Sequence, residues 1–262
     1  MDKATIIKIG GNIVDDEALL QSFLQKFAAL AGAKILVHGG GKLATRLAEE
    51  LNIPQQMIDG RRITSAETLK IVTMVYAGYI NKNIVAILQS NECNALGVTG
   101  ADGNCIRAHK RAAAEIDYGF AGDVDTVDAP FFSRMLLQQI VPVIAPLTHD
   151  GQGQLLNTNA DTIAHQVAQA LSRHFQTTLV YCFEREGVLL DTTDEESVIQ
   201  NITPGSYKTL RSGNIIYAGM IPKLDAAFAA VASGVARVVI GNGNKLDKLL
   251  EGTSGTSITN GA

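Results

Sequence analysis

The sequence predicts an α/β protein, a three-layer αβα sandwich in which helices cover both faces of a mainly parallel, open central sheet. Short apolar runs alternate with segments of helical periodicity along the chain, which is the pattern of strand–helix–strand units. The 262 residues are 46% hydrophobic and 18% charged, so the chain can bury a sizeable core. This length suits one large domain or two lobes that share one sheet.

Two apolar runs open the chain. Residues 5–11 (TIIKIGG) and 35–41 (ILVHGGG) each end in glycines and are predicted to be strands. The segment after the second run repeats leucine at every fourth position, at Leu43, Leu47 and Leu51. We therefore predict a helix that buries this leucine face.

Five segments continue the alternation in the second half of the chain. Residues 140–147 are apolar almost throughout, as in a strand covered on both faces. Residues 160–171 repeat apolar side chains at helical spacing, and 222–234 begin with a proline and end at a glycine, so both are predicted helices. Residues 177–183 and 236–242 are predicted strands.

The segment 97–128 has a different pattern. It contains an Asp102-Gly103 turn signal and the run DVDTVD, in which acids alternate with apolar residues or threonine. We expect antiparallel hairpins inserted at the edge of the sheet. The acids resemble part of a calcium-binding loop, but the central glycine and final glutamate of that motif are absent, so a solvated acidic strand is favoured over a metal site.

Composition and charge argue against several classes of function. The net charge is −4 and the pI is about 5.7, with no basic run, so nucleic acid is not an expected partner. Cys93, Cys105 and Cys182 lie outside any C-x-x-C spacing and are expected to be reduced thiols in a cytoplasmic protein. No uninterrupted apolar run approaches the ~18 residues of a membrane span, and no secretory signal is expected.

The stretch VHGGGK (37–42) raises the question of a P-loop, the phosphate-binding loop of Walker-type NTPases. That motif needs a glycine five residues before Gly41 and a hydroxyl after the lysine, but Leu36 and Leu43 occupy these positions. The P-loop hypothesis therefore fails. Three glycines at a strand end still let backbone N–H groups approach an anion at a helix N-terminus. Gly39–Gly41, the second glycine loop, is thus a candidate anion site, with a tight turn as the alternative.

The first glycine loop, Gly10–Gly11, follows a lysine inside an apolar strand. Strand alternation places Lys8 on the face opposite Ile7 and Ile9. A lysine within a central strand is costly unless it is paired, and ligands of open α/β sheets bind at the carboxyl ends of the strands. We therefore expect Lys8 to serve a ligand site, with an edge-strand lysine as the alternative.

Five motifs, in order along nearly the whole chain, carry a resemblance to a known family. They are KIGGN, VHGGGK, GRRIT, NTNAD and AGMIPKLDAA. Together they resemble the amino acid kinase superfamily and, within it, the acylglutamate kinases. The resemblance implies the amino acid kinase fold and ATP-dependent phosphorylation of the γ-carboxylate of an N-acyl-L-glutamate, N-acetyl or N-succinyl, in arginine biosynthesis. Because that carboxylate is ionised at neutral pH, no general base is required, and His38 is expected to be a positioning or packing residue.

The resemblance also implies roles in the phosphoryl transfer. Lys8 and Lys223 would contact the transferring phosphoryl group, and Asp161 would orient both lysines. Backbone N–H groups of Gly11 and Gly40 would face the same phosphoryl group. Taken singly, Asp161 could instead charge the first turn of its helix, and Lys223 could be a solvated first-turn lysine.

Substrate contacts follow from the same resemblance. Gly40 and Gly41 would bind the acylglutamate, Arg62 would grip a substrate carboxylate with its planar fork, and Asn157 would add a further contact. Arg61 stands where the family often has an apolar residue, so Arg62 is the expected clamp. Asn157 could otherwise be a turn residue.

ATP is the implied phosphoryl donor, with Mg²⁺ carried on its phosphates rather than in a cage of protein carboxylates. The implied nucleotide contacts lie in the C-terminal part of the chain, at Glu184, Gly187, Val188, Leu189, Ile215, Ile216, Tyr217, Gly219 and Met220. Glu184 occupies the place of the family's usual aspartate. Lys42 replaces a frequent proline, and we expect no catalytic role for it.

The resemblance further implies an N-terminal lobe, 1–172, for acylglutamate binding and dimerisation, and a C-terminal lobe, 173–262, for nucleotide binding. The first strand begins near residue 5, which leaves no room for the N-terminal helix with which arginine-inhibited relatives build hexamers. A homodimer without arginine inhibition is therefore expected. The apolar segment 68–88 would be its dimer helix, or else ordinary core.

Two alternatives stay open. Another member of the superfamily, an aspartokinase, carbamate kinase or nucleotide monophosphate kinase, would share the first glycine loop and its lysine. A catalytically inert metabolite sensor on the same fold is the second, because Glu184 and the unusual loop 183–189 depart from the family's nucleotide motif.

Overall fold

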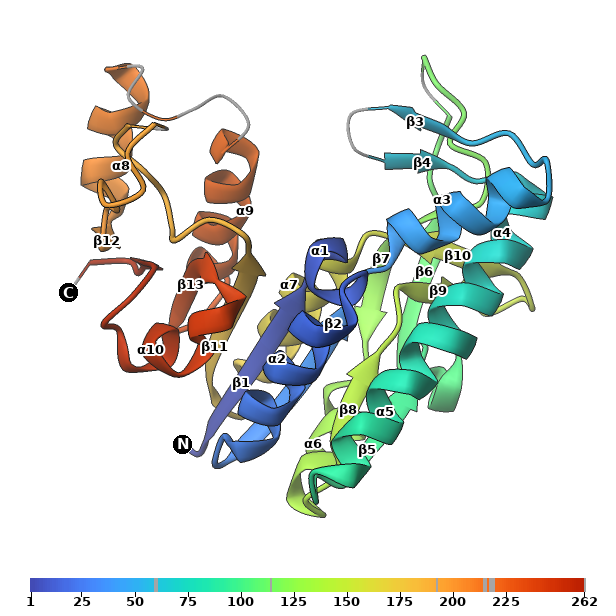
Figure 1. Cartoon of the computed structure of the whole chain (residues 1–262), viewed down its shortest axis with the longest axis horizontal. Helices are drawn as coiled ribbons and strands as arrows, with labels where there is room; N and C mark the ends of the chain where they lie inside the picture. The colour runs from blue at the N-terminus through green and yellow to red at the C-terminus, as the bar shows by residue number, and fades with distance from the viewer. Residues whose placement is uncertain (59–60, 114, 192, 214–215, 217–219, 262) are drawn as a thin grey trace.

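The computed structural model describes residues 1–58, 61–113, 115–191, 193–213, 216 and 220–261. Its centre is an eight-stranded sheet (Figure 1). The strands are β1 (Lys3–Ile9), β2 (Ala33–His38), β5 (Ala95–Val98), β8 (Val141–Ile144), β11 (Gln176–Phe183), β12 (Asn201–Ile202), β13 (Arg237–Asn242) and β14 (Thr256–Ile258). Their order is β12-β14-β13-β11-β1-β2-β8-β5, and every neighbouring pair is parallel except β13–β14. The predicted mainly parallel sheet is confirmed.

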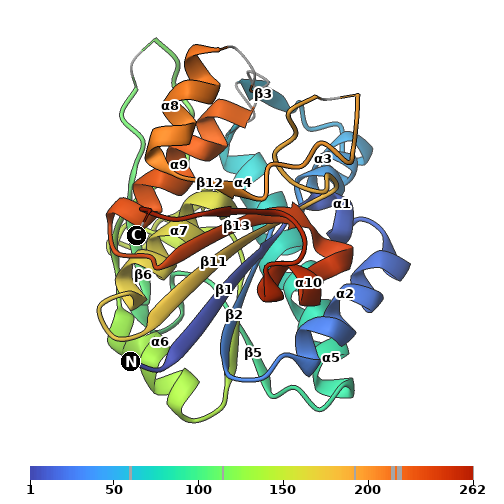
Figure 2. The ribbon, with the colours of Figure 1, turned by 90° about the vertical axis from the view of Figure 1, so that its left-hand side faces the viewer.

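Helices cover both faces of this sheet. The α-helices are α1 (Gly11–Val14), α2 (Glu17–Ala29), α3 (Gly41–Glu50), α4 (Ala66–Val72), α5 (Asn81–Ser90), α6 (Ala129–Leu137), α7 (Ala160–Leu171), α8 (Pro204–Ser212), α9 (Ile221–Ala232) and α10 (Leu246–Glu251). A π-helical segment, η1 (Thr73–Ile80), joins α4 to α5, and 3₁₀ turns occupy η2 (Asp102–Asn104) and η4 (Gly243–Lys245). Figure 2 shows α6, α7 and α9 on one side of the sheet and α2, α5 and α10 on the other, which confirms the three-layer sandwich.

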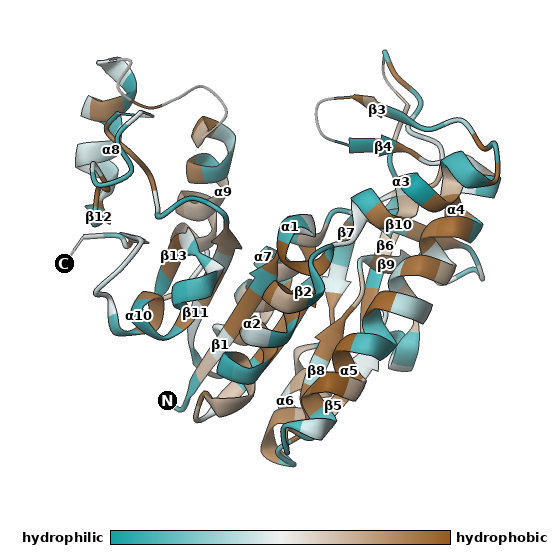
Figure 3. Cartoon of the chain, viewed as in Figure 1, coloured by the Kyte–Doolittle hydropathy of each residue, from teal (hydrophilic) through white to brown (hydrophobic). Residues whose placement is uncertain are grey.

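Two apolar cores fill the spaces between the sheet and the helices. Ile6 packs in the core beside α7 and α9, whereas Ile7 and Ile9 pack in the core beside α2 and α5. Strand alternation places Lys8 on the face of Ile6, as predicted. Figure 3 shows hydrophobic residues along β8 and on α5. Because β1 lies between β11 and β2, the edge-strand alternative for Lys8 is wrong.

Four further strands form a separate closed barrel. They are β6 (Ile106–Lys110), β7 (Ala121–Val127), β9 (Leu147–His149) and β10 (Leu155–Thr158), in the order β10-β7-β6-β9. The pairing of β6 with β7 confirms an antiparallel hairpin within 97–128. The prediction that it lies at the sheet edge is wrong, because β5 holds that edge and the hairpin closes on β9 and β10. The apolar run 140–147 is accordingly divided between β8 and β9. Outside the sheet and the barrel, β3 (Gln56–Ile58) and β4 (Arg61–Ile63) form a small antiparallel pair.

The helix after the second glycine loop buries a different face from the predicted one. Leu43 and Leu47 are half-buried, and Leu51, one residue past the end of α3, is 53% exposed. Ala44 and Ala48 are the completely buried positions. Their short side chains let α3 pack closely on α4 and η1. In α7, by contrast, the apolar face predicted from the spacing is buried throughout.

One continuous helical run, Ala66–Ser90, is long and apolar enough to cross a membrane by length and composition alone, which a count of uninterrupted apolar residues does not detect. Its most apolar window is 44% buried inside the fold, and core helices of soluble proteins meet the same criterion. Ile71, Ile80 and Ile84 belong to the core. Met74 and Tyr79 are 54% and 67% exposed, so ordinary core accounts for only part of this run.

A buried histidine ties the second glycine loop to this helical run. His38 is fully buried, with Nδ1 2.8 Å from the carbonyl of Gly39 and Nε2 3.1 Å from Asn81 Nδ2. The Asn81 amide also donates to the carbonyl of Val143 at 3.0 Å. Since the amide nitrogen donates, Nε2 accepts and Nδ1–H donates to Gly39. Burial is the main cause that lowers the pKa of His38 to about 4, so the ring is neutral and is not a cation of the site.

This depressed pKa predicts acid sensitivity of the fold. The unfolded histidine takes up a proton near pH 6.5 and the folded one only near pH 4, so stability is complete above about pH 6.5 and falls as the pH drops toward 4. Between pH 7 and pH 4.5 the loss from this residue is roughly 2 to 3 kcal/mol. Urea unfolding of the wild type and of His38→Gln at both pH values measures it. We expect the wild type to lose more stability on acidification by that amount, and equal losses in the two proteins would refute the assignment.

Candidate active site

The carboxyl ends of three neighbouring strands meet at one edge of the sheet. The register places Ile9 at the end of β1 opposite His38 of β2 and Cys182 of β11. The two glycine loops and Phe183 follow at these strand ends, so three segments far apart in sequence converge there. The N–H of Gly39 donates to the carbonyl of Ile9 at 3.0 Å and joins the second glycine loop to the end of β1, directly before the first glycine loop.

Two cavities open at this edge and share Lys8, Gly10 and Gly11 in their walls. The barrel-side cavity, of about 220 Å³, is lined further by the second glycine loop, β4, β7 and the segment leading into α7. The Phe183-side cavity, of about 370 Å³, is lined further by Asn12, Ile13, Cys182, Phe183, Glu184, Arg185 and Lys223. An anion in one cavity and an anion in the other would thus meet at Lys8 and the first glycine loop.

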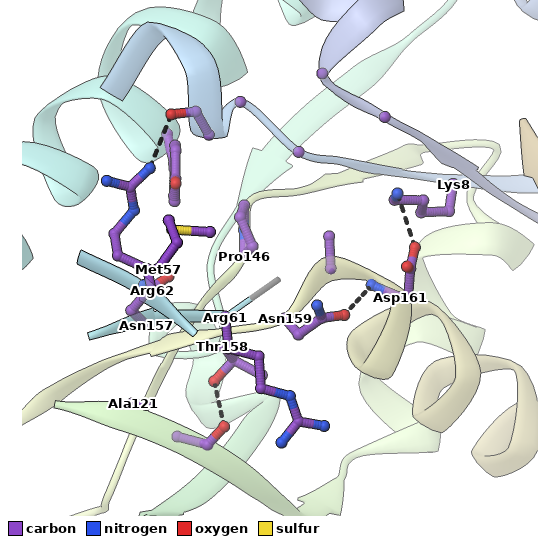
Figure 4. Close-up of a pocket in the computed structure, with 18 of the residues that line it drawn as sticks. Lys8, Met57, Arg61, Arg62, Ala121, Pro146, Asn157, Thr158, Asn159 and Asp161 are labelled. Atoms are coloured by element: carbon purple, nitrogen blue, oxygen red, sulfur yellow. Dashed lines mark hydrogen bonds and ion pairs between the residues drawn. The ribbon is translucent and has the colours of Figure 1, made fainter. Parts of the chain in front are cut away.

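Lys8 is paired at this junction. It is 8% exposed, and its Nζ lies 2.7 Å from Oδ1 of Asp161 (Figure 4). Asp161 stands in the first turn of α7, where a carboxylate also favours the helix dipole. Oδ1 of Asn159 caps this turn by accepting from the backbone N–H groups of Asp161 and Thr162 at 2.8 and 3.1 Å. Asp161 therefore both pairs with Lys8 and occupies the first turn of α7, and the Asn159 cap fixes the backbone of that turn.

Lys223 reaches the same junction from the first turn of α9. Its Nζ lies 3.8 Å from the ring centroid of Phe183, and Nζ of Lys8 lies 5.7 Å from that centroid. Burial is the largest cause of a lowered pKa of Lys223, Asp161 acts in the opposite direction and the charge of Lys8 lowers the pKa further. The structure therefore brings together Lys8, Lys223 and Asp161, which are 215 positions apart at the extremes (8 to 223).

The second glycine loop lies against the helical run 66–90. Gly40 has φ +150°, and a Cβ there would lie 2.2 Å from Cδ1 of Ile80 and 3.3 Å from the Tyr76 ring. Only glycine fits both the backbone angle and the space. Since α3 begins at Gly41, its first N–H groups have no intrahelical partner and are available to an anion.

Arg62 forms part of the wall of the barrel-side cavity that lies across from Lys8 and Asp161 (Figure 4). It is 7% exposed, and its Nη2 donates to the carbonyl of Gly41 at 2.9 Å and to Oγ1 of Thr45 at 2.8 Å, while Nη1 donates to Gln55. The predicted arginine is thus fixed against the second glycine loop. Asn157, also in this wall, donates from Nδ2 to Oγ1 of Thr64 at 3.0 Å.

Several lining residues of the barrel-side cavity are missed by sequence reasoning. Arg111, Met57 and Tyr76 line it, and so does Arg61, which the sequence argument passes over in favour of Arg62. Arg111 Nε donates to Asp123 Oδ2 at 2.9 Å, and a second bond joins the same pair. This cross-strand pair depends on the β6–β7 pairing, for which no local spacing gives a signal.

The residues expected to contact the nucleotide divide into three groups. Glu184 lines the Phe183-side cavity. Gly187, Val188 and Leu189 are buried and line neither cavity, because this segment packs on Thr256, whose Oγ1 accepts from the Val188 N–H at 2.8 Å.

The remaining nucleotide positions lie near the start of α9. Ile216 is buried in the core, and Met220 directly precedes α9 at its N-cap position without a side-chain capping bond. Ile215, Tyr217 and Gly219 lie outside the described residues.

The positive charges described at the site belong to lysine and arginine side chains. Within the described part of the chain, no three His, Cys, Asp or Glu side chains gather into a group that could hold a metal ion. The arrangement supplies one buried and one half-buried ammonium group, together with helix N-termini, where two cavities meet. Such a junction can stabilise the charge of a group that passes between two anions.

Known proteins share this sequence and this fold. A sequence profile of the amino acid kinase family matches residues 3–242. Acetylglutamate kinase of Phocaeicola vulgatus is 57% identical over 239 residues, which cover 91% of this chain and 93% of that protein. Acetylglutamate kinase of Cytophaga hutchinsonii is 57% identical over 251 residues, 95% of each chain. The solved structure of N-acetylglutamate synthase from Neisseria gonorrhoeae, 22% identical, shares the fold with a TM-score of 0.82 and covers 99% of this chain, which spans 60% of that one.

The family profile covers most of the chain, and the relatives match it over nearly their whole length. The glycine loops and Lys8 lie at the strand ends where ligands of open α/β sheets bind, and Arg62 lines the cavity there. On these grounds the chain belongs to the amino acid kinase family, in its acetylglutamate kinase branch.

Proposed function

We propose that this chain catalyses ATP-dependent phosphorylation of the γ-carboxylate of N-acetyl-L-glutamate, as a step of arginine biosynthesis. The observation that carries the proposal is the junction of two cavities at Lys8 and the first glycine loop. Donor and acceptor are both anions, and a paired, buried lysine between them counters their repulsion. The three buried, unbridged cysteines fit reduced thiols and a cytoplasmic location.

In this proposal the barrel-side cavity holds the acylglutamate. Arg62 and Asn157 contact it, with the backbone of Gly40 and Gly41. A γ-carboxylate oxygen attacks the γ-phosphorus of ATP, the new carboxyl–phosphoryl bond forms, and the bond to the departing ADP oxygen breaks. The carboxylate is already ionised, so no residue has to remove a proton.

The Phe183-side cavity holds the phosphates of ATP. Lys8 and Lys223 neutralise the transferring phosphoryl group, N–H groups of Gly11 and Gly40 face it, and Asp161 orients Lys8. Mg²⁺ binds with the nucleotide, on its phosphate oxygens, where it offsets their charge. The division into an acceptor lobe (1–172) and a nucleotide lobe (173–262) follows the sheet, since β1, β2, β5 and β8 precede this boundary and β11 to β14 follow it.

N-succinyl-L-glutamate is the second candidate substrate, and two additional arginines favour it. Arg61 and Arg111 line the barrel-side cavity together with Arg62. A succinyl group carries one carboxylate more than an acetyl group, and arginine binds carboxylates as a two-pronged donor. Arg111 is paired with Asp123, so the exposed Arg61 is the cation for this extra charge.

A homodimer is proposed from exposed apolar side chains beside the free edge of the sheet. Met74 and Tyr79 project from the helical run 66–90, and Leu96 of the edge strand β5 is 49% exposed. β5 packs on α5, and α5 packs on η1, from which Met74 and Tyr79 come, so the three side chains belong to neighbouring elements. A second copy would cover them.

The substrate is tested by ADP release in the presence of four acceptors. We expect turnover with N-acetyl-L-glutamate, with N-succinyl-L-glutamate as the second candidate, and none with L-aspartate or UMP. Turnover with L-aspartate or UMP alone would assign another superfamily activity. Calorimetry that shows acylglutamate binding without ATP binding or turnover would identify a metabolite sensor instead of an enzyme.

Variants of Lys8 and Lys42, the lysines beside the two glycine loops, distinguish the proposed mechanism from that of a P-loop enzyme. Lys8→Ala should lower kcat roughly 10²- to 10³-fold, because a buried donor to the transferring group is removed. Lys42 is exposed, and its Nζ donates to the side chain of Asn12, so Lys42→Ala should stay within about threefold of the wild type. Steady-state kinetics measure both variants. A larger loss of kcat in Lys42→Ala than in Lys8→Ala would favour the P-loop hypothesis instead.

The oligomeric state is tested by light scattering of the wild type and two charge variants. The wild type should have the mass of two chains. A Met74→Glu/Tyr79→Glu variant should have the mass of one, because burying two carboxylates in an apolar contact is unfavourable. Leu137→Glu, at a residue 73% exposed at the end of α6, is the matched control and should stay dimeric. A monomeric or hexameric wild type would reject this dimer.

A further inference from the structure

The ring of Phe183 lies close to both lysines of the site. Phe183 is the last residue of β11, next to β1, and its ring stacks on Tyr181 with the centroids 6.3 Å apart. The ammonium of Lys223 lies 3.8 Å from its centroid and that of Lys8 lies 5.7 Å from it. Both distances are within the ~6 Å range in which a ring face attracts a cation.

Two like charges at one junction repel each other, and each needs a compensating contact. Lys8 has Asp161 at 2.7 Å. Across the described residues, Lys223 makes no hydrogen bond or ion pair, and its close contact is the Phe183 face. Burial and the charge of Lys8 disfavour its ammonium form, whereas the charges of Asp161 and Glu184 favour it without forming a hydrogen bond or ion pair with Lys223. Since neither carboxylate forms an ion pair with Lys223, the ring is the close contact that sets the position of its ammonium.

We propose that Phe183 is a positioning residue that holds the Lys223 ammonium at the phosphoryl-transfer junction by a cation–π contact. A carboxylate at this place would cancel the charge of Lys223 and repel incoming phosphates. A ring face attracts the cation without a formal charge and engages only the N–H turned toward it, so the other N–H donors stay available for phosphate oxygens. This inference rests on the proposed phosphoryl transfer.

Fluorination of the ring tests the contact directly. Each fluorine weakens the negative face of the ring with little change in its shape. With mono-, di- and trifluorophenylalanine at position 183, log kcat should fall in proportion to fluorine number, while KM for N-acetyl-L-glutamate changes less than about twofold. Phe183→Leu should lose roughly 5- to 30-fold in kcat, about 1 to 2 kcal/mol at 1.36 kcal/mol per factor of ten. Phe183→Tyr should retain most of the activity. A flat fluorine series would overturn the proposal.

Phe228 supplies a matched control on the same helix as Lys223. It stacks on Tyr207 with centroids 4.9 Å apart and lines neither cavity. Phe228→Leu should leave kcat within about twofold of the wild type. A loss equal to that of Phe183→Leu would show that α9 packing, not the ring face, explains the effect, and would count against the proposal.

A measurement without turnover separates this inference from the proposed function. In the ¹³C-lysine NMR spectrum, assigned with Lys223→Arg, the ε-methylene protons of Lys223 should resonate upfield because of the ring current of Phe183. Phe183→Leu should return them to the position of an exposed lysine. An inactive wild type with this upfield resonance would reject the acetylglutamate activity but not the contact. An active wild type without it would reject the contact alone.

Discussion

A buried lysine near the carboxyl end of a central strand is tolerated here because Asp161 lies 2.7 Å from its ammonium. The carboxylate is in turn fixed by the Asn159 cap at the start of α7. An unpaired ammonium at 8% exposure would carry a desolvation cost of several kcal/mol. Once the pair is in place, the first glycine loop must follow at the strand end, and both cavities take their common wall from it. The position of the site thus depends on one ion pair between β1 and α7.

Parallel strand order explains why distant motifs meet. Because β2 and β11 flank β1, the residues after these three strands lie side by side at one edge, although 145 positions separate His38 from Phe183 (183 − 38). A βαβ alternation, read from apolar spacing, therefore predicts both the sheet and the edge at which ligands bind. Lys8, Arg62, Asn157 and Asp161 were predicted to belong to the site, and all four line the barrel-side cavity.

What the sequence did not predict depends on contacts between remote segments. The barrel needs β6 and β7 to pair with β9 and β10, and α3 buries alanines rather than leucines because of its close approach to α4 and η1. The local spacing of apolar residues predicts neither the pairing of the barrel strands nor the buried face of α3. In the sequence, Gly187 to Leu189 resemble a ligand-binding loop, but in the structure this segment packs on Thr256. In the sequence, Phe183 is only the apolar end of a strand, and its contact with Lys223 depends on the position of α9.

The close approach at Gly40 links two positions that differ by 40 in number. A Cβ at position 40 would lie 2.2 Å from Cδ1 of Ile80, and Ile80 immediately precedes Asn81, whose amide is bonded to His38. A smaller residue at 80 would leave a void beside the loop, and a larger one at 40 would displace η1. Because the φ of +150° excludes a side chain at position 40 whatever the space, a smaller residue at 80 cannot make room for one. Glycine at 40 therefore stays fixed, and the size of residue 80 alone sets how closely the loop packs on η1, one position before the asparagine that holds His38.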